Sequence, residues 1–408
     1  MDDHEIPHHF ICPISLQIMK DPVTVITGIT YDRDSIQRWQ SHAQNNTCPV
    51  TNQLLPLDSD FTPNHNLRRL IQSWQVLDQP SKQSSLHMIK VIAINLIKNL
   101  KVQDLKIESL QSLVNLAYES ENNRVLLKEV GVVSAMFTFL VSCYTRNCIN
   151  SGLKEALNIL YLVRITRNEA HSILAKHDWF ISLLTWVLDL DHACDDAHTT
   201  LKFHAIVLLK DVIQYAKSHV LERLNRDFFK TIVLNLQYQK TNNLDHGTKE
   251  ILEIMLSTCT WPRNCSKLTD LGVVFELVEV ELGSPEKAIT ELVMSILFHL
   301  CSLADGRAQL LGHAGGIAMI TKRIGRVSQK VGERAVMIIS LISKFSGTRE
   351  VVQEMVKVGT VEKLCMVLQV YSLNSYTRDT ARDILKRHFN VWNGSSCLDV
   401  TLLTRCLN

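Results

Sequence analysis

The fold is decided by residues 6–16, which read Ile6-Pro7-His8-His9-Phe10-Ile11-Cys12-Pro13-Ile14-Ser15-Leu16, and by residues 48–52, which read Cys48-Pro49-Val50-Thr51-Asn52. Each Cys-Pro segment is predicted to form a tight loop, and the first loop would display Ile14 and Leu16. Between the loops, residues 23–25 and 30–31 are expected to pair as a small hairpin that turns at Gly28.

A helix is expected to begin near Arg33, with Asp32 as its cap and Asp34 close to its positive end. Ile36 and Trp39 lie three residues apart on one face of this helix, so Ile36 is predicted to point inward and Trp39 toward a groove. Core packing is the alternative for Trp39. A closing helix is predicted after Pro63-Asn64, because the apolar residues there have helical spacing: Leu67, Leu70, Ile71 and Trp74.

The cysteines of this segment argue against a zinc site. A cross-braced zinc domain needs two tetrahedral sites with four ligands each, supplied by closely spaced pairs of Cys and His. Cys12 and Cys48 each stand alone, and the nearby histidines have no suitable spacing. We therefore predict no metal and no other cofactor. Packing and hydrogen bonds would hold the loops instead, through polar residues that include Asp32, Arg33, Thr51 and Asn64.

Composition excludes several classes of partner. The chain has 408 residues, 46% hydrophobic residues and a formal net charge of +2, so neither nucleic acid nor an anionic membrane is an expected partner. No apolar run is long enough to predict a membrane span. Asp2, Asp3 and Glu5 do not resemble a secretory leader. The eleven cysteines are scattered through apolar sequence, which favours a reduced intracellular protein over a disulfide framework.

A repeat follows the N-terminal module. Residues 79–85 are polar and contain Pro80, which predicts a linker, and helical apolar stripes continue beyond them. The expected turn positions are 43 to 49 residues apart and comprise Gly131, Asp178, Asp227, Gly272, Gly315 and Gly359. A period near 45 residues, with two or three helices per unit, is typical of armadillo or HEAT repeats. An ordinary helical bundle would have to match five successive intervals by chance.

The N-terminal motifs resemble the U-box, a metal-free domain with the shape of a RING finger, and the whole chain resembles the plant U-box/armadillo ubiquitin ligases. The expected fold is a small α+β U-box (1–78), a linker (79–85), an all-α armadillo/HEAT-like solenoid (86–390) and a C-terminal tail (391–408). The resemblance implies that a ubiquitin-conjugating enzyme carrying ubiquitin contacts five residues: Ile14, Leu16, Trp39, Pro49 and Asn52.

The resemblance also implies how the chain would act. As an E3 ligase it would have no catalytic residue and no covalent ubiquitin intermediate, and the armadillo repeats would bind the protein substrate. Some U-boxes carry arginine where this chain has Asn52, which leaves the strength of activation open. Asn115 either lines a substrate groove, as in many armadillo repeats, or satisfies a neighbouring helix. The expected setting is plant stress or immune signalling in the cytoplasm, with the nucleus as a second compartment.

One alternative function stays open at this point. The chain could be a non-catalytic armadillo adaptor whose U-box does not activate a conjugating enzyme, or serves only to form a homodimer.

Overall fold

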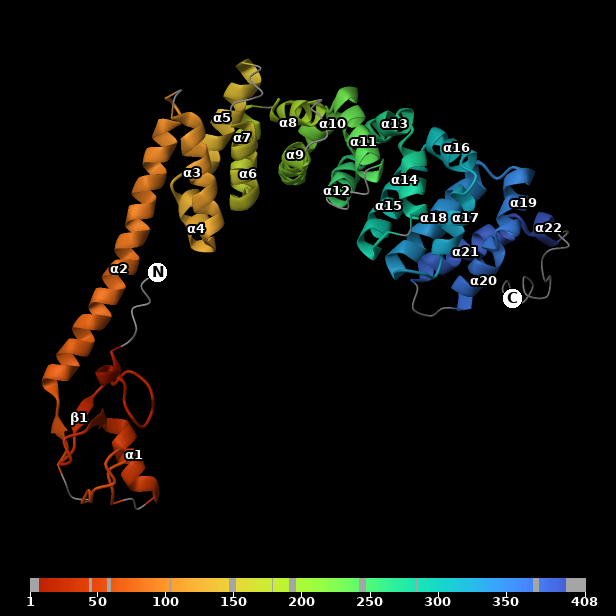
Figure 1. Cartoon of the computed structure of the whole chain (residues 1–408). Helices are drawn as coiled ribbons and strands as arrows, with labels where there is room; N and C mark the ends of the chain where they lie inside the picture. The colour runs from red at the N-terminus through yellow and green to blue at the C-terminus, as the bar shows by residue number, and fades with distance from the viewer. Residues whose placement is uncertain are drawn as a thin grey trace. The chain divides into compact units, whose positions relative to one another are not determined.

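The structure is a computed structural model, and it describes residues 7–43, 46–56, 60–102, 105–146, 152–177, 179–190, 196–241, 247–283, 285–369 and 374–393 (Figure 1). The chain divides into two compact units, Met1–Ile94 and Asn95–Asn408. The predicted turn position Asp178 and all but three residues of the predicted tail lie outside the described residues.

The N-terminal unit is a three-stranded antiparallel sheet with one short helix and most of a long one. The strand order is β2-β1-β3, and Val23 of the central strand faces Tyr31 on one side and Pro63 on the other. Gly28, at φ 80°, allows the predicted turn between β1 and β2. The elements are η1 (His8–Phe10), β1 (Pro22–Thr24), β2 (Thr30–Asp32), α1 (Arg33–Ala43), β3 (Thr62–Pro63) and α2 (His65–Asn99).

The core of this unit lies between the sheet, the two Cys-Pro loops and α1. Cys12, Tyr31, Ile36 and Cys48 are completely buried in it. The predictions that Ile36 points inward and that both cysteines are small core residues are therefore confirmed. Trp39 is half-buried and packs against the edge of the same core.

Two polar side chains of the N-terminal unit hold its elements together. Asn64 caps α2, because its Oδ1 accepts the backbone N–H of Leu67 at 3.0 Å. Asp32 does not cap α1 as predicted: its Oδ1 accepts the backbone N–H groups of Lys20 and Asp21, at 2.7 and 2.9 Å. The strand pairing next to Asp32 turns this carboxylate toward the chain before β1, away from the helix that follows it.

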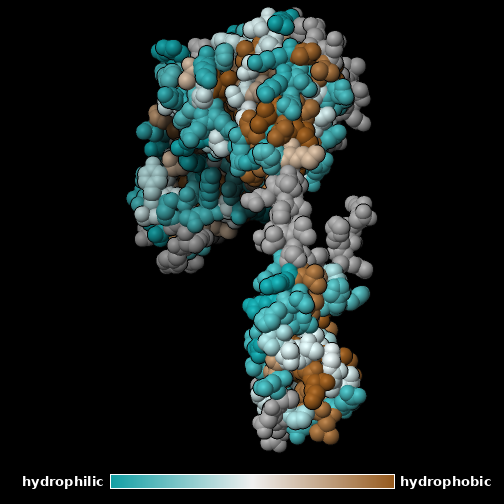
Figure 2. All heavy atoms as spheres, turned by 90° about the vertical axis from the view of Figure 1, so that its left-hand side faces the viewer, coloured by the Kyte–Doolittle hydropathy of each residue, from teal (hydrophilic) through white to brown (hydrophobic). Residues whose placement is uncertain are grey.

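The long helix α2 differs from the expectation at residues 79–85. The sequence predicted a linker there, but the backbone of α2 is helical from His65 to Asn99 without a break. A polar composition does not exclude a helix, because a helix surrounded by solvent can have polar residues on all of its faces. Figure 2 shows hydrophobic side chains at the surface of the C-terminal half of this helix, where Met88, Val91 and Ile92 are exposed.

The second unit consists of three-helix repeats. Each repeat has a long helix, a short helix and a third helix, and α21 and α22 form a last, partial repeat. The helices are α3 (Lys106–Glu119), α4 (Glu121–Glu129), α5 (Val132–Arg146), α6 (Leu153–Val163), α7 (Arg167–Lys176), α8 (Phe180–Asp189), α9 (Asp196–Tyr215), α10 (Ser218–Glu222), α11 (Arg226–Thr241), α12 (Thr248–Thr258), α13 (Pro262–Asp270), α14 (Val273–Leu282), α15 (Lys287–Leu300), α16 (Ala304–Gly312), α17 (Gly316–Arg323), α18 (Gln329–Phe345), α19 (Arg349–Lys357), α20 (Thr360–Gln369), α21 (Ser375–Arg387) and α22 (Phe389–Asn393).

The long helices form one continuous layer of the second unit. Each packs on the next in the order α3, α6, α9, α12, α15, α18, α21, and the third helices form a second layer from α5 to α20 (Figure 1). Each repeat buries its apolar face against its neighbours, as a solenoid requires. The predicted helical repeat is confirmed, with three helices per unit.

The predicted turn positions are correct in part. Gly131, Gly272 and Gly359 have φ between 74° and 84° and directly precede the third helix of their repeats. Asp227 is not a turn residue, because it lies in the first turn of α11, where a negative charge favours the helix N-terminus. The turn comes earlier, at Arg223, and Asn225 then caps α11, because its Oδ1 accepts the N–H of Phe228.

Within the described residues, no single helix has the length and apolar character needed to cross a membrane. Only α4 and α5 taken together reach them, and that pair is bent by 71°.

Candidate functional site

The two Cys-Pro loops of the N-terminal unit have the same construction. In the first loop, the N–H of Cys12 donates to the Gln17 carbonyl and the N–H of Leu16 donates to the Cys12 carbonyl, both at 2.8 Å. In the second loop, the N–H of Cys48 donates to the Gln53 carbonyl and the N–H of Asn52 donates to the Cys48 carbonyl, both at 2.9 Å. The fifth residue of each loop is left-handed, with φ 55° at Leu16 and 57° at Asn52.

The Cys48 thiol is the centre of a hydrogen-bond cluster at the base of the second loop. The Thr27 hydroxyl donates to its sulfur at 3.2 Å, and the Tyr31 hydroxyl lies 3.0 Å from it. Tyr31 also accepts the backbone N–H of Val50 at 3.3 Å, so one phenol joins the sheet to the loop. Burial acts to raise the pKa of Cys48, but hydrogen bonds from Thr27, Thr51 and Tyr31 lower it to about 6.

The Cys12 thiol has the equivalent position under the first loop. Its sulfur accepts the backbone N–H of Asp32 at 3.3 Å, which ties the loop to the end of β2. Burial acts to raise the pKa of Cys12, and hydrogen bonds from the backbone of Asp32, Ser15 and Ile14 outweigh it and lower the pKa. Hydrogen bonds to sulfur thus hold both loops where a zinc domain would use metal–thiolate bonds.

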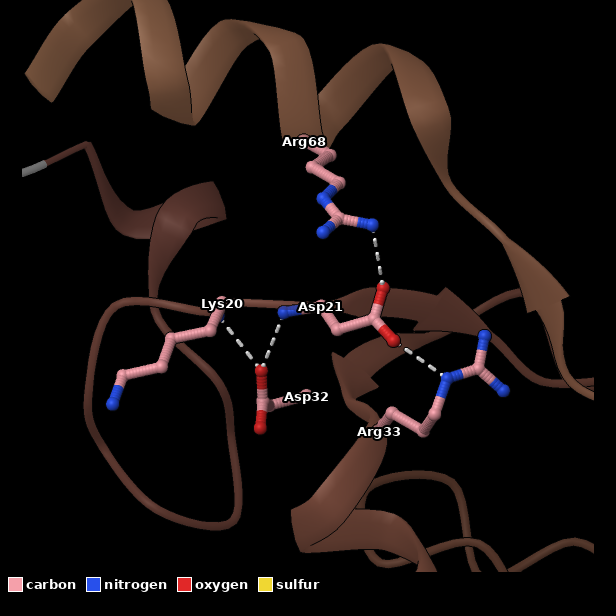
Figure 3. A network of polar contacts seen from close by, with 5 residues as sticks. All are labelled: Lys20, Asp21, Asp32, Arg33 and Arg68. Atoms are coloured by element: carbon pink, nitrogen blue, oxygen red, sulfur yellow. Dashed lines mark hydrogen bonds and ion pairs between the residues drawn. The ribbon is translucent and has the colours of Figure 1, made fainter. Parts of the chain in front are cut away.

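Two carboxylates brace this frame from the outside (Figure 3). Asp21 receives the Arg33 Nε at 2.6 Å and the Arg68 Nη1 at 3.4 Å, so it joins the start of α1 to α2. The Asp32 carboxylate lies beside it and receives the N–H groups of Lys20 and Asp21. The predicted polar network is confirmed for Asp32, Arg33, Thr51 and Asn64, each of which makes hydrogen bonds.

A groove lies between the first loop and α1. Ile14 and Ile18 line one side of it, and Trp39 lies on the other. The Trp39 indole N–H donates to the carbonyl of Thr47 at 3.2 Å, which fixes the ring next to the second loop. Three charged residues also line the groove: Lys20, which precedes β1, and Asp34 and Arg38, which are on α1.

The structure places the five predicted contact residues on two loops and one helix. Ile14 and Trp39 share the groove, and both also pack partly against the core. Leu16 is 77% exposed at the end of the first loop. Pro49 is half-buried and Asn52 exposed in the second loop, and neither lines the groove.

Sequence reasoning missed three groups that shape this site: the Tyr31 hydroxyl, the Thr27 hydroxyl and the charged residues Lys20, Asp34 and Arg38. The sequence carries no signal for these three groups, but it does carry one for two other hydroxyls, those of Ser15 and Thr51. Cys12-Pro13-Ile14-Ser15-Leu16-Gln17 and Cys48-Pro49-Val50-Thr51-Asn52-Gln53 share the pattern Cys-Pro-x-(Ser/Thr)-x-Gln, which indicates two copies of one loop with a hydroxyl beside each thiol.

Across the described residues, no group of three or more His, Cys, Asp or Glu side chains is placed to hold a metal ion. Asn115 is exposed on α3, the first helix of the long-helix layer, and its role in substrate binding stays a prediction.

Comparison with known proteins identifies the family. Residues 6–79 match the U-box domain family, and residues 92–408 match the family described as plant U-box protein ARM repeat region. The chain belongs to the plant U-box/armadillo family. Its N-terminal unit is a U-box, and its second unit is an armadillo-repeat array.

Relatives match the whole chain. E3 ubiquitin-protein ligase PUB24 of Arabidopsis thaliana is 41% identical, and the match covers 100% of this chain and 97% of that protein. E3 ubiquitin-protein ligase PUB23 of the same plant is 34% identical, with 99% and 98% covered. Among solved structures, one described as "A conserved phosphorylation switch controls the interaction between cadherin and beta-catenin in vitro and in vivo" matches 72% of this chain and 52% of its own, at 14% identity and a TM-score of 0.56. That likeness supports the fold alone.

Proposed function

We propose that this protein is an E3 ubiquitin-protein ligase whose U-box holds a ubiquitin-conjugating enzyme and whose armadillo repeats hold the protein substrate. The observation that carries the proposal is the U-box surface, where exposed Leu16 stands beside the groove of Ile14 and Trp39. The names of the relatives PUB24 and PUB23 support the same class of activity.

The conformation of Leu16 supports a binding role for the first loop. A left-handed residue other than glycine costs roughly 1–2 kcal/mol, and Leu16 has this conformation at φ 55° with its side chain in solvent. The hydrogen bond from its N–H to the Cys12 carbonyl imposes that conformation. The loop therefore presents an apolar side chain at an energetic cost, as contact residues of binding sites do.

The groove beside Leu16 fits a weak and exchangeable interface. Ile14 and Trp39 provide a small apolar anchor, and Lys20, Asp34 and Arg38 provide a polar rim. Exchange is useful to a ligase, because a discharged conjugating enzyme has to leave before a charged one binds. Pro49 and Asn52 would extend the contact onto the second loop.

The proposed reaction needs no nucleophile from this chain. A substrate lysine attacks the ubiquitin thioester on the conjugating enzyme, the new amide bond forms, and the enzyme's cysteine is released as a thiol. The ligase contributes proximity, which can supply up to roughly 7–11 kcal/mol in well-oriented cases. Rate enhancement would come from positioning of the lysine by the armadillo repeats and of the thioester by the U-box.

Asn52 bears on the strength of activation. Its left-handed backbone at φ 57° suits asparagine, which tolerates this conformation better than most residues. Asn52 can donate or accept hydrogen bonds, but it carries no charge toward ubiquitin. We expect Asn52→Arg to speed ubiquitin transfer if the second loop contacts the charged conjugating enzyme.

The test is chain formation in a reconstituted reaction with activating enzyme, a panel of conjugating enzymes, ubiquitin and ATP. The wild-type protein should form polyubiquitin, and Ile14→Ala, Leu16→Ala and Trp39→Ala should each reduce it strongly while the fold persists. Ile26→Ala is the matched control, since Ile26 is 73% exposed on the hairpin of the same unit and does not line the groove. A wild-type protein inactive with every conjugating enzyme would favour the adaptor function, with or without a U-box homodimer.

The cellular setting is part of the proposal. We place the protein in the cytoplasm, with the nucleus as a second compartment, in plant stress or immune responses. Asn115 would contact substrate from the first long helix, and its replacement should lower substrate ubiquitination more than free chain formation.

A further inference from the structure

A second groove, remote in sequence from the U-box, lies in the armadillo array. It has a volume of about 340 Å³ and is formed by the α17–α18 connection and the end of α20. Ile324 and Val367 are buried at its floor, and its other members include Arg326, Val327, Lys363 and Met366.

The connection that forms one wall holds a strained residue. Val327 has φ 71°, and the N–H of Ser328 donates to the Arg326 carbonyl at 3.0 Å, which closes a tight turn around it. A left-handed conformation is rare for a β-branched side chain and persists only where the surroundings impose it. Glycine would fit this turn without strain, so the strain comes from the valine side chain.

Two large apolar side chains stand open at the mouth of the groove. Val327 is 41% exposed and Met366 is 51% exposed, one from each wall. Between Val327 and Met366 lies an apolar slot whose size suits one large apolar side chain of a bound peptide.

Positive charge surrounds this slot. Arg326 and Lys363 line it, and among the described residues no carboxylate does. Among the described residues neither cation has an ion pair, and the nearby Glu333 is taken up by hydrogen bonds from Gln329 and Asn374. The groove therefore combines an apolar floor with two cations that make no ion pair among the described residues.

We propose that this groove binds an acidic segment of a protein partner that inserts one large apolar side chain between Val327 and Met366. Carboxylates on either side of the anchor would pair with Arg326 and Lys363. A second copy of the chain fits less well, because a symmetric contact would set these cations against each other. The identity of the partner as substrate rests on the proposed ligase function, but the binding itself does not.

The experiment uses the full-length protein and a random dodecapeptide library displayed on phage. Enriched peptides should carry Asp or Glu around a Leu, Ile, Phe or Met anchor, and one of them, synthesised with a fluorophore, serves as the probe for anisotropy. Arg326→Glu with Lys363→Glu should weaken its binding by at least about tenfold, which corresponds to roughly 1.4 kcal/mol.

Val327→Gly separates binding from folding. It removes the apolar wall but suits the turn, so the probe should bind several-fold more weakly while the unfolding temperature stays equal or rises. The matched charge control is Arg349→Glu with Lys357→Glu, two exposed cations of α19 outside the groove, which should leave binding unchanged.

Three results would overturn the site: no enriched peptide, enriched peptides that are neutral or basic, or equal loss of binding in the groove and control variants. The two proposals fail separately. An inactive wild-type protein in the ubiquitin assay would refute the ligase function, whereas peptide binding that depends on Arg326, Lys363 and Val327 would still establish the groove.

Discussion

At the residue scale, the hydroxyl of Tyr31 links the sheet of the U-box to its second loop. It is completely buried, contacts the Cys48 sulfur and accepts the N–H of Val50. Tyr31→Phe keeps the ring but leaves that N–H without its partner, so we expect a loss of about 1–3 kcal/mol in the free energy of unfolding. Urea unfolding of the full-length protein measures the loss.

Tyr118→Phe is the control for this substitution. Tyr118 is 60% exposed, and its hydroxyl donates to the Asn158 Oδ1 at 3.3 Å, where water can replace the bond. Its removal should change the unfolding free energy by less than about 0.5 kcal/mol. Equal effects at both tyrosines would mean that the buried hydroxyl has no special structural role.

The Cys48 thiol predicts a pH dependence of stability. Its pKa is about 6 in the folded protein, against about 8.5 for an ordinary cysteine, so the folded state favours the thiolate. The contribution to stability is complete above about pH 8.5 and is lost as the pH falls through about 6. The advantage of wild type over Cys48→Ser should therefore grow from pH 6 to 8.5. A difference in stability between the two proteins that stays constant across that range would show that Cys48 is not a thiolate in the folded state.

The burial and contacts of single residues were predictable where one physical principle decided them. Ile36 follows from helix periodicity, and the burial of Cys12 and Cys48 follows from the lack of further zinc ligands. The partner of Asp32 was not predictable, because capping and cross-strand bonding compete for one carboxylate and the tertiary structure decides. Nor does the sequence show the strain at Val327, since only the path of the chain between α17 and α18 creates it.

At the element scale, helix α16 shows how closely the helices of a repeat approach. A Cβ on Gly306 would overlap the carbonyl oxygen of Leu300 at the end of α15. Gly306→Ala should therefore destabilise the armadillo unit by about 1–3 kcal/mol, because backbone has to shift. Thermal unfolding measures this.

The same helix provides the control. Gly312 ends α16, and a Cβ there would meet no atom within 4 Å. Gly312→Ala should leave the unfolding temperature unchanged or raise it, since alanine favours helix over glycine by up to about 1 kcal/mol. A drop like that of Gly306→Ala would mean that the loss at Gly306 does not come from its close approach to Leu300.

Elements were predictable from periodicity, and their ends were not. The apolar stripes and the period near 45 residues indicated the solenoid, because every repeat has to bury the same face. The continuous helix α2 was missed, since a polar segment with proline favours a linker when only local composition is considered. The turn was predicted at Asp227, which instead lies two residues after the helix cap Asn225, because Asp and Asn both suit turns and helix starts.

At the scale of the whole molecule, the division into two units predicts two separable unfolding events. Ile36 and Leu297 are completely buried, one in each unit. Replacing either residue with alanine should lower the free energy of unfolding of its own unit by about 2–5 kcal/mol. Hydrogen–deuterium exchange followed by mass spectrometry should show faster exchange in the U-box for Ile36→Ala and in the repeats for Leu297→Ala. Faster exchange throughout the chain in both variants would mean that the units unfold together.

The matched burial of Cys12 and Cys48 has a practical consequence. Neither sulfur is accessible while its loop is closed, so an alkylating reagent can label it only when the U-box opens. The labelling rates of the two cysteines, read by mass spectrometry in a complete ubiquitination mixture, would show whether the loops open together or one at a time. A zinc-bound domain offers no such internal reporter, since its metal masks the same thiols.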